Sequence, residues 1–156
     1  MAAPGSAARF IGTAAELLTG QGWHIVDAAP ASFDLVIAKE KSTVVVHTQT
    51  VLFFVTADGL SREERDELME QAHALTGETA TAPLFPATAV VVYVYTGTIP
   101  AEEQAAKKRD LARGHATVAW NVTLADGTLR THTGTPLVRD GKRALEQALH
   151  RLTDDG

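Results

Sequence analysis

The sequence predicts a single α/β domain of the α+β type, built on a mixed β-sheet. Three short extended segments follow the first helical segment with short connections, which is typical of an antiparallel meander. The run at residues 89–95 is apolar on both faces and strand-length, which indicates a central strand covered on both sides. The dipeptide Asp126-Gly127 and a final helical pattern then predict a C-terminal β-hairpin and helix.

The N-terminal part is expected to begin with a helix over residues 7–18, where apolar residues recur at helical spacing. Gly20 or Gly22 offers a stop for this helix, because glycine tolerates the backbone conformation that ends helices. Pro30 closes the first of three extended segments that follow. These segments are expected at residues 23–28, 33–38 and 43–55.

The polar run at residues 39–42 is expected to form the turn before the third segment, which is either one long strand or a pair broken near Gln49. Ser61 and Glu64 have the spacing of a capping box, in which each side chain binds the other residue's free backbone N–H. We therefore expect a second helix from Ser61, ended by Gly77.

A strand at residues 89–95 that follows a helix should be reached by a helical crossover, which implies parallel pairing. A third helix is expected over residues 101–112, followed by a half-buried strand over residues 118–124. The return strand should span residues 128–133, and Asp140 should cap the last helix.

At 156 residues the chain fits one domain, with a core at about 7–96 and a C-terminal extension at about 97–153. The net charge of −5 argues against a nucleic-acid partner, because such proteins usually carry basic excess or a dense basic stripe. The tight basic cluster at residues 107–109 has acidic neighbours and is interpreted as a solvated helix face.

The chain has no cysteine, which excludes disulfides, thiolate nucleophiles and cysteine-based zinc sites. No basic leader and no apolar run of membrane-spanning length are visible, so we expect a cytoplasmic protein without a membrane partner. The histidines lack metal-site spacing, and no cofactor is expected. They are His24, His47, His73, His115, His132 and His150.

The order helix, three-strand meander, helix and parallel strand resembles the core of the restriction-endonuclease-like superfamily, the PD-(D/E)xK nucleases. Two runs strengthen the likeness, which covers roughly residues 7–95. The first strand of that superfamily is similar to Gly22-Trp23-His24-Ile25-Val26, and the second to Phe33-Asp34-Leu35-Val36. The resemblance implies an α-β-β-β-α-β core flanked by helices.

The resemblance also implies that Asp34 stands where the superfamily has its first metal-binding carboxylate. The second carboxylate and a lysine two residues later would fall on or near His47-Thr48-Gln49, where neither is present. Asp34, His47 and Gln49 are thus vestigial candidates at most, and no catalytic residue is assigned. An equally open interpretation makes Asp34 a strand-edge residue that binds a nearby backbone N–H.

Two further patterns bear on function. Thr96-Gly97-Thr98 follows the central strand, where α/β proteins often bind ligands, but it lacks phosphate-loop spacing and is interpreted as a plain turn. Thr131 and Thr133 on the last strand suggest an exposed sheet edge, which pairs readily with another chain.

Three hypotheses follow. The first is a non-catalytic protein-interaction or assembly module on an endonuclease-like scaffold, with a protein partner or self-association. The second is a metal-dependent nuclease, with Mg²⁺ and with ligands rearranged around Asp34, in which Glu63, Glu64 or another glutamate or lysine of the helix after Ser61 enters the site. The third is a small-molecule-binding domain with a pocket over the sheet near Trp23 and Trp120.

Overall fold

The computed structural model describes residues 6–26, 31–42, 47–79, 87–100, 108–110, 115–131 and 136–155. The described helices are α1 (Ser6–Gly20), α2 (Arg62–Thr79) and α3 (Pro136–Asp155). The described strands are β1 (His24–Ile25), β2 (Leu35–Ser42), β3 (His47–Thr56), β4 (Ala87–Tyr95), β5 (Lys108–Asp110), β6 (His115–Thr123) and β7 (Thr128–Arg130).

The seven described strands form one mixed sheet in the order β1-β2-β3-β4-β6-β5, with β7 also paired to β6. Strands β1, β2 and β3 form the expected antiparallel meander, and β3, β4 and β6 are parallel. Because β4 occupies one side of β6, the short strands β5 and β7 share the other side, each antiparallel to a different half of β6. The fold is therefore mixed α/β, as predicted.

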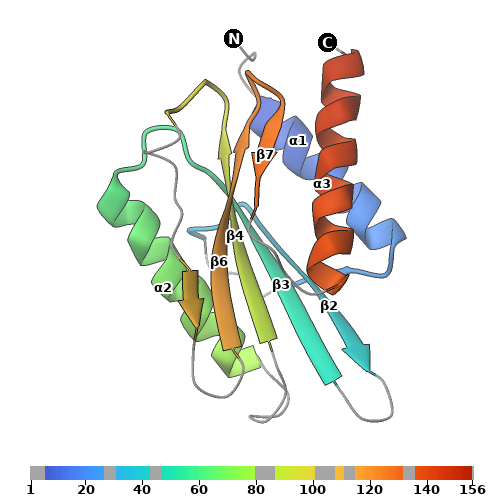
Figure 1. The fold of residues 1–156 in the computed structure, drawn as a ribbon, viewed down its shortest axis with the longest axis vertical. Coiled ribbons are helices and arrows are strands. Elements are labelled where there is room, and N and C mark those ends of the chain that lie inside the picture. Colours follow the sequence, from blue (N-terminus) through green and yellow to red (C-terminus); the bar gives the residue numbers. More distant parts are fainter. Residues whose placement is uncertain are drawn as a thin grey trace.

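Helices cover both faces of this sheet (Figure 1). One apolar cluster lies between the sheet and helices α1 and α3, and the other lies between the sheet and α2. Alternate residues of β4 enter the two clusters, since successive side chains of a strand point to opposite faces. Val90 and Val92 lie in the first cluster, whereas Val91 and Tyr93 lie in the second.

Strand β4 confirms the prediction of a central parallel strand. It pairs in parallel with β3 on one side and with β6 on the other. Its residues from Ala89 to Val94 are entirely buried. The unbroken apolar run at residues 89–95 reflects this position, because a strand with helices on both faces has no solvent-facing side.

Two helix ends follow the local rules read from the sequence. At the end of α1, Gly22 has φ +95°, its N–H donates to the Thr19 carbonyl at 3.2 Å, and the Trp23 N–H donates to the Leu18 carbonyl at 3.1 Å. This is a Schellman motif, which satisfies the last carbonyls of a helix. At the start of α2, Ser61 and Glu64 form both hydrogen bonds of the capping box, each at 3.1 Å.

The predicted turn at residues 39–42 is wrong, because these residues belong to β2. They pair with the first residues of β3, which runs through Gln49 without a break. Lysine and glutamate have low strand propensity, but pairing with a neighbouring strand overrides such a preference. The first strand is shorter than predicted: β1 holds two residues, and residues 27–30 lie outside the described part.

The predicted helix at residues 101–112 is wrong for residues 108–110, which form β5; its other residues lie outside the described part. From Thr117 to Thr123, strand β6 is buried on both faces rather than half-buried, with Asn121 5% and Thr123 2% exposed, because its side chains face the cluster under α1 and α3 on one side of the sheet and the cluster under α2 on the other. Thus the expected C-terminal extension supplies three strands of the same sheet.

Three element ends also differ from expectation. Helix α3 begins at Pro136, which suits a first helical position because proline lacks the N–H that is unpaired there, and Asp140 lies within the helix. Helix α2 continues past Gly77 to Thr79, and β7 ends at Arg130. Within the described part, no helix has both the length and the apolar character needed to cross a membrane.

Candidate functional site

Asp34 lies immediately before β2, at the open end of the β2–β3 hairpin. Its backbone N–H donates to the Phe54 carbonyl at 2.8 Å, and its carboxylate Oδ2 accepts a hydrogen bond from the Thr56 N–H at 2.7 Å. Both bonds extend the β2–β3 ladder by one step. The structure therefore gives Asp34 the role of a strand-edge residue that binds a neighbouring backbone N–H.

The register of the hairpin separates Asp34 from the other two vestigial candidates. Leu35 lies opposite Phe54, whereas Gln49 lies opposite Glu40 and His47 lies opposite Ser42. At about 3.3 Å per residue, Gln49 is roughly 20 Å from Asp34 along the strand, and His47 is further still. The fold does not bring the three candidates together; the His47 side chain lies outside the described part.

Gln49 is buried on the face of the sheet that α2 covers. Val51, two residues later on the same strand, points to the same face and belongs to the apolar cluster there. Its side-chain carbonyl has no hydrogen-bond partner among the described residues. Lys39, the nearest lysine whose side chain is described, donates its ammonium group to the Gln21 carbonyl at 2.9 Å. That contact ties β2 to the end of α1 and engages the ammonium group there.

The carboxyl ends of the parallel strands hold a second group of polar residues. Asp58, after β3, accepts hydrogen bonds from the Thr96 backbone N–H at 3.1 Å and from the Thr96 hydroxyl at 3.0 Å. The Thr98 hydroxyl donates to Asp126, after β6, at 3.4 Å. The turn at residues 96–98 thus uses its polar groups to join the ends of three strands.

Carboxylates at this edge bind backbone and hydroxyl donors. In the described part of the chain, no group of three or more histidine, aspartate or glutamate residues has the arrangement needed to hold a metal ion. Glu64, one of the candidate ligands of a rearranged nuclease, accepts the Ser61 N–H of the capping box.

Tyr93 and Tyr95 lie on the α2 face near Arg65. The Tyr93 hydroxyl donates to the Arg65 carbonyl at 2.7 Å. Burial, and after it the negative charge that Tyr95 and Asp66 can carry, raises the pKa of Tyr93. Burial also raises the pKa of Tyr95, although the Arg65 guanidinium opposes the change. Both phenols are therefore held neutral, which suits packing inside the protein rather than acid–base chemistry.

Trp23 and Trp120 lie in the cluster between the sheet and helices α1 and α3, at 3% and 0% exposed. A Cβ on Gly141 of α3 would lie 3.6 Å from the Trp23 ring, so the helix backbone rests directly on that indole. The site expected for a small-molecule pocket is thus occupied by core side chains and by α3.

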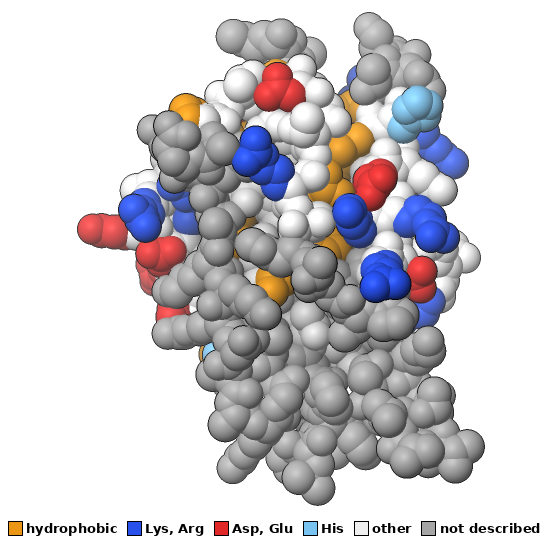
Figure 2. All heavy atoms as spheres, viewed as in Figure 1, with side chains coloured by type: hydrophobic (Ala, Val, Ile, Leu, Met, Phe, Trp, Pro, Cys, Tyr) orange, Lys and Arg blue, Asp and Glu red, His pale blue; other side chains and the backbone are white. Residues whose placement is uncertain are grey.

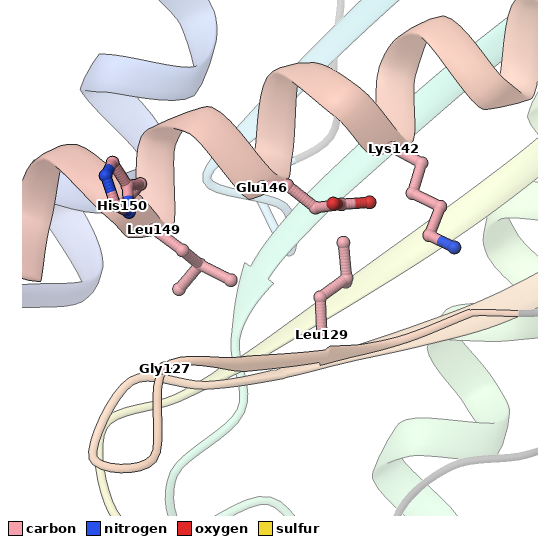
Figure 3. Close-up of a pocket in the computed structure, with 6 residues that line it drawn as sticks. All are labelled: Gly127, Leu129, Lys142, Glu146, Leu149 and His150. Atoms are coloured by element: carbon pink, nitrogen blue, oxygen red, sulfur yellow. The ribbon is translucent and has the colours of Figure 1, made fainter.

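A groove between β7 and α3 was missed in the sequence. It has a volume of about 450 Å³, and Figure 3 shows Leu129 from β7 and Leu149 from α3 pointing into it. In Figure 3 the Glu146 side chain lies above Leu129, and Lys142 lies to one side of it. The residues that line the groove are Gly127, Leu129, Lys142, Glu146, Leu149 and His150.

A shallower depression adjoins this groove on the outer face of α3, lined by Arg143, Glu146, Gln147, His150 and Arg151. Glu146 and His150 belong to both hollows, so the two are continuous. On α3 these residues form two neighbouring rows with a spacing of four positions, Lys142, Glu146 and His150 beside the groove and Arg143, Gln147 and Arg151 further around the helix. That spacing was visible in the sequence, but the contribution of β7 was not.

Charge is divided between the two sides of the molecule. Among the described side chains, α3 has four exposed cations and two acidic residues, whereas α2 has five acidic residues and two cations. Figure 2 shows blue side chains gathered over α3, beside an apolar strip and with red ones among them, and both red and blue side chains on the side of α2. The α3 cations are Arg139, Lys142, Arg143 and Arg151. The acidic residues of α2 are Glu63, Glu64, Asp66, Glu67 and Glu70.

Comparison with protein-family models and with curated proteins found no match for this chain.

Proposed function

We propose that this chain is a non-catalytic, cytoplasmic protein-interaction or assembly module on an endonuclease-like scaffold. The proposal for the scaffold draws on the order α1-β1-β2-β3-α2-β4 and on the parallel pairing of β4 with β3. Both features are those expected from the resemblance in the first half of the sequence.

The register of the β2–β3 hairpin is the observation that supports a non-catalytic role. Metal-dependent hydrolysis needs a Mg²⁺ held by clustered oxygen ligands, and in this superfamily a nearby ammonium group. Asp34 uses its carboxylate to bind the Thr56 N–H, and Gln49 lies six residues further along the ladder. An isolated carboxylate is a poor site for a divalent cation.

The charge and shape of the surface around α3 support the interaction role, whereas the polar residues at the strand ends do not bear on it. The chain has a net charge of −5, yet one helix carries most of the described exposed cations, beside a groove whose floor holds two leucines. Interfaces usually combine a buried apolar centre with a polar rim. The α3–β7 groove has this composition.

A plasmid-nicking assay with Mg²⁺ and Mn²⁺ tests the non-catalytic part. We expect no cleavage above that of the metal alone, for the wild-type chain and for Asp34→Ala alike. Cleavage by the wild-type chain that Asp34→Ala abolishes would instead establish the rival nuclease, with ligands rearranged around this residue.

Affinity purification from the native host tests the interaction part, provided that the complex is then rebuilt from purified components. Wild-type protein should retain a partner with defined stoichiometry. Sedimentation of the purified chain across a range of concentrations separates this outcome from self-association. A chain that stays monomeric and forms no reconstituted complex would contradict the proposal.

A further inference from the structure

We infer that the groove between β7 and α3 binds a short acidic segment of a partner protein, with one apolar side chain of that segment seated on Leu129 and Leu149. This inference rests on the proposed interaction function and names its surface and its partner class.

The floor of the groove can hold an apolar anchor. Leu129 is half-buried and Leu149 is 6% exposed, and both contact the core cluster between the sheet and α1 and α3. The floor is therefore fixed by the fold rather than formed on binding. A volume of about 450 Å³ lies within the range of about 300–1,000 Å³ that small ligand pockets occupy, which is room for one large side chain and part of its backbone.

The rim of the groove favours negative charge. Lys142 lines the groove, and Arg143 and Arg151 line the depression beside it. All three side chains are exposed, so their charges face an incoming partner. Carboxylates next to the anchor would meet Lys142 in the groove and Arg143 in the row beside it, and Arg151, further around the helix, adds long-range attraction that raises the association rate.

Glu146 distinguishes a peptide from a nucleic acid as the occupant. Its carboxylate lies between Lys142 and His150, one helical turn from each, and is shared by both hollows. A continuous row of phosphates laid along α3 would have to pass this carboxylate. A peptide can instead seat its apolar residue on Leu129 and Leu149 and direct its acidic residues to Lys142 and Arg143, away from Glu146.

A second copy of the chain is a weaker candidate for the occupant. Helix α2 would supply negative charge, but its large apolar residues face the sheet: Leu68 and Met69 are buried there, and the partly buried Leu75 packs against the same cluster. It therefore presents charge without an anchor for the groove. A partner segment that carries both is the better complement.

The test uses the full chain and a short fluorescein-labelled peptide in which a central leucine is flanked by aspartates. Fluorescence polarisation measures its affinity, and ¹H–¹⁵N correlation spectra locate the contact. We expect saturable binding, with shifts concentrated in residues 127–130 and 142–151. A peptide with flanking lysines, and one with a central glycine, should each bind at least tenfold more weakly.

Substitutions that are expected to change the peptide affinity in opposite directions make the test specific. Lys142→Glu and Arg143→Glu should each weaken binding about fivefold, since one charge pair is lost and a repulsion gained. Glu146→Gln should tighten it several-fold by removing a carboxylate from the groove. Arg62→Glu, an exposed position on α2 with the same charge change, is the matched control and should leave affinity unchanged.

Several outcomes would overturn the inference. These are no saturable binding, shifts on another surface, equal weakening by Arg62→Glu, or tighter binding of a DNA duplex than of the peptide at the same residues. If the peptide does not bind and the chain shows no metal-dependent nicking, the groove is ruled out as the binding site, but an interaction role through another surface is not. Nicking abolished by Asp34→Ala would remove the proposed function itself.

Discussion

The carboxylate of Asp34 accepts a hydrogen bond from the backbone N–H of Thr56, with an N–O distance of 2.7 Å. The residue stands one position before β2, and Thr56 is the last residue of β3. The side chain therefore closes the open end of the hairpin where the next backbone pair of the ladder would lie. We therefore expect the Asp34 carboxylate to contribute to the stability of the protein rather than to catalysis.

Replacing Asp34 by alanine should lower the free energy of unfolding by about 1 kcal/mol, because the Thr56 N–H loses its acceptor. Asp34→Asn retains a side-chain oxygen and should recover most of that loss. Chemical denaturation of the two variants measures the difference. If asparagine proved as costly as alanine, the charge rather than the hydrogen bond would be the important property.

Glycines at two positions, one within α1 and one just after it, should respond oppositely to alanine. Gly22 has φ +95°, so Gly22→Ala should destabilise the protein by about 1–2 kcal/mol. Gly12 lies inside α1, where an added Cβ would come within 4 Å of no other part of the described chain. Gly12→Ala should therefore stabilise the protein by up to about 1 kcal/mol through helix propensity. Thermal unfolding of both variants checks this pair, and shifts of the same sign would contradict it.

Gly141 reports on the contact between α3 and the sheet. A Cβ there would lie 3.5 Å from Leu52 and 3.6 Å from Trp23, which is ordinary van der Waals contact. Gly141→Ala should therefore be neutral or stabilising, since alanine favours the helix. Gly141→Leu should cost about 1–3 kcal/mol by forcing α3 away from the core. Denaturation midpoints, with tryptophan fluorescence as the signal, distinguish the two.

Alkaline pH should unfold the protein through its tyrosines. The pKa values of Tyr93 and Tyr95 are raised by burial, so the native chain keeps protons that the unfolded chain releases above pH about 10. Stability is thus fully present below that pH and falls above it, by up to roughly 1.4 kcal/mol per pH unit for each group.

Phenolate absorbance measures this directly, because the chain has two tyrosines and both are these residues. The native protein should show no phenolate until the circular dichroism signal is lost, and both groups should then ionise together. The denatured chain, as a control, should titrate near pH 10. A phenolate signal from folded protein would show that one ring is open to solvent.

Local patterns predicted much of the fold. The capping box of Ser61 and Glu64 and the central position of residues 89–95 depend on neighbours in sequence or on the pattern of one segment, and the structure confirms both. Of the two glycines that could end the first helix, Gly20 and Gly22, the structure uses Gly22. The hairpin register was not predictable in the same way. Residues 39–42 have turn composition, and it is pairing with β3 that makes them a strand.

The groove could not be found from the sequence for a related reason. Leu129 and Leu149 are twenty positions apart and belong to a strand and a helix, so only the packing of α3 against β7 brings them together. The helical spacing of Lys142, Glu146 and His150 was visible, but a charged helix face is usually plain solvent-exposed surface. The candidate site thus depends on contacts between elements.

The parallel placement of β4 between β3 and β6 also governs how fast the chain can reach this fold. Neither pairing can form as a local hairpin, since each joins segments separated by a long stretch of sequence. The entropy of closing those loops is lost before the contacts compensate for it, which slows folding of such topologies toward milliseconds or longer. During that interval the apolar run of β4 is exposed, so nascent chains are most prone to aggregate before the middle of the sheet has closed.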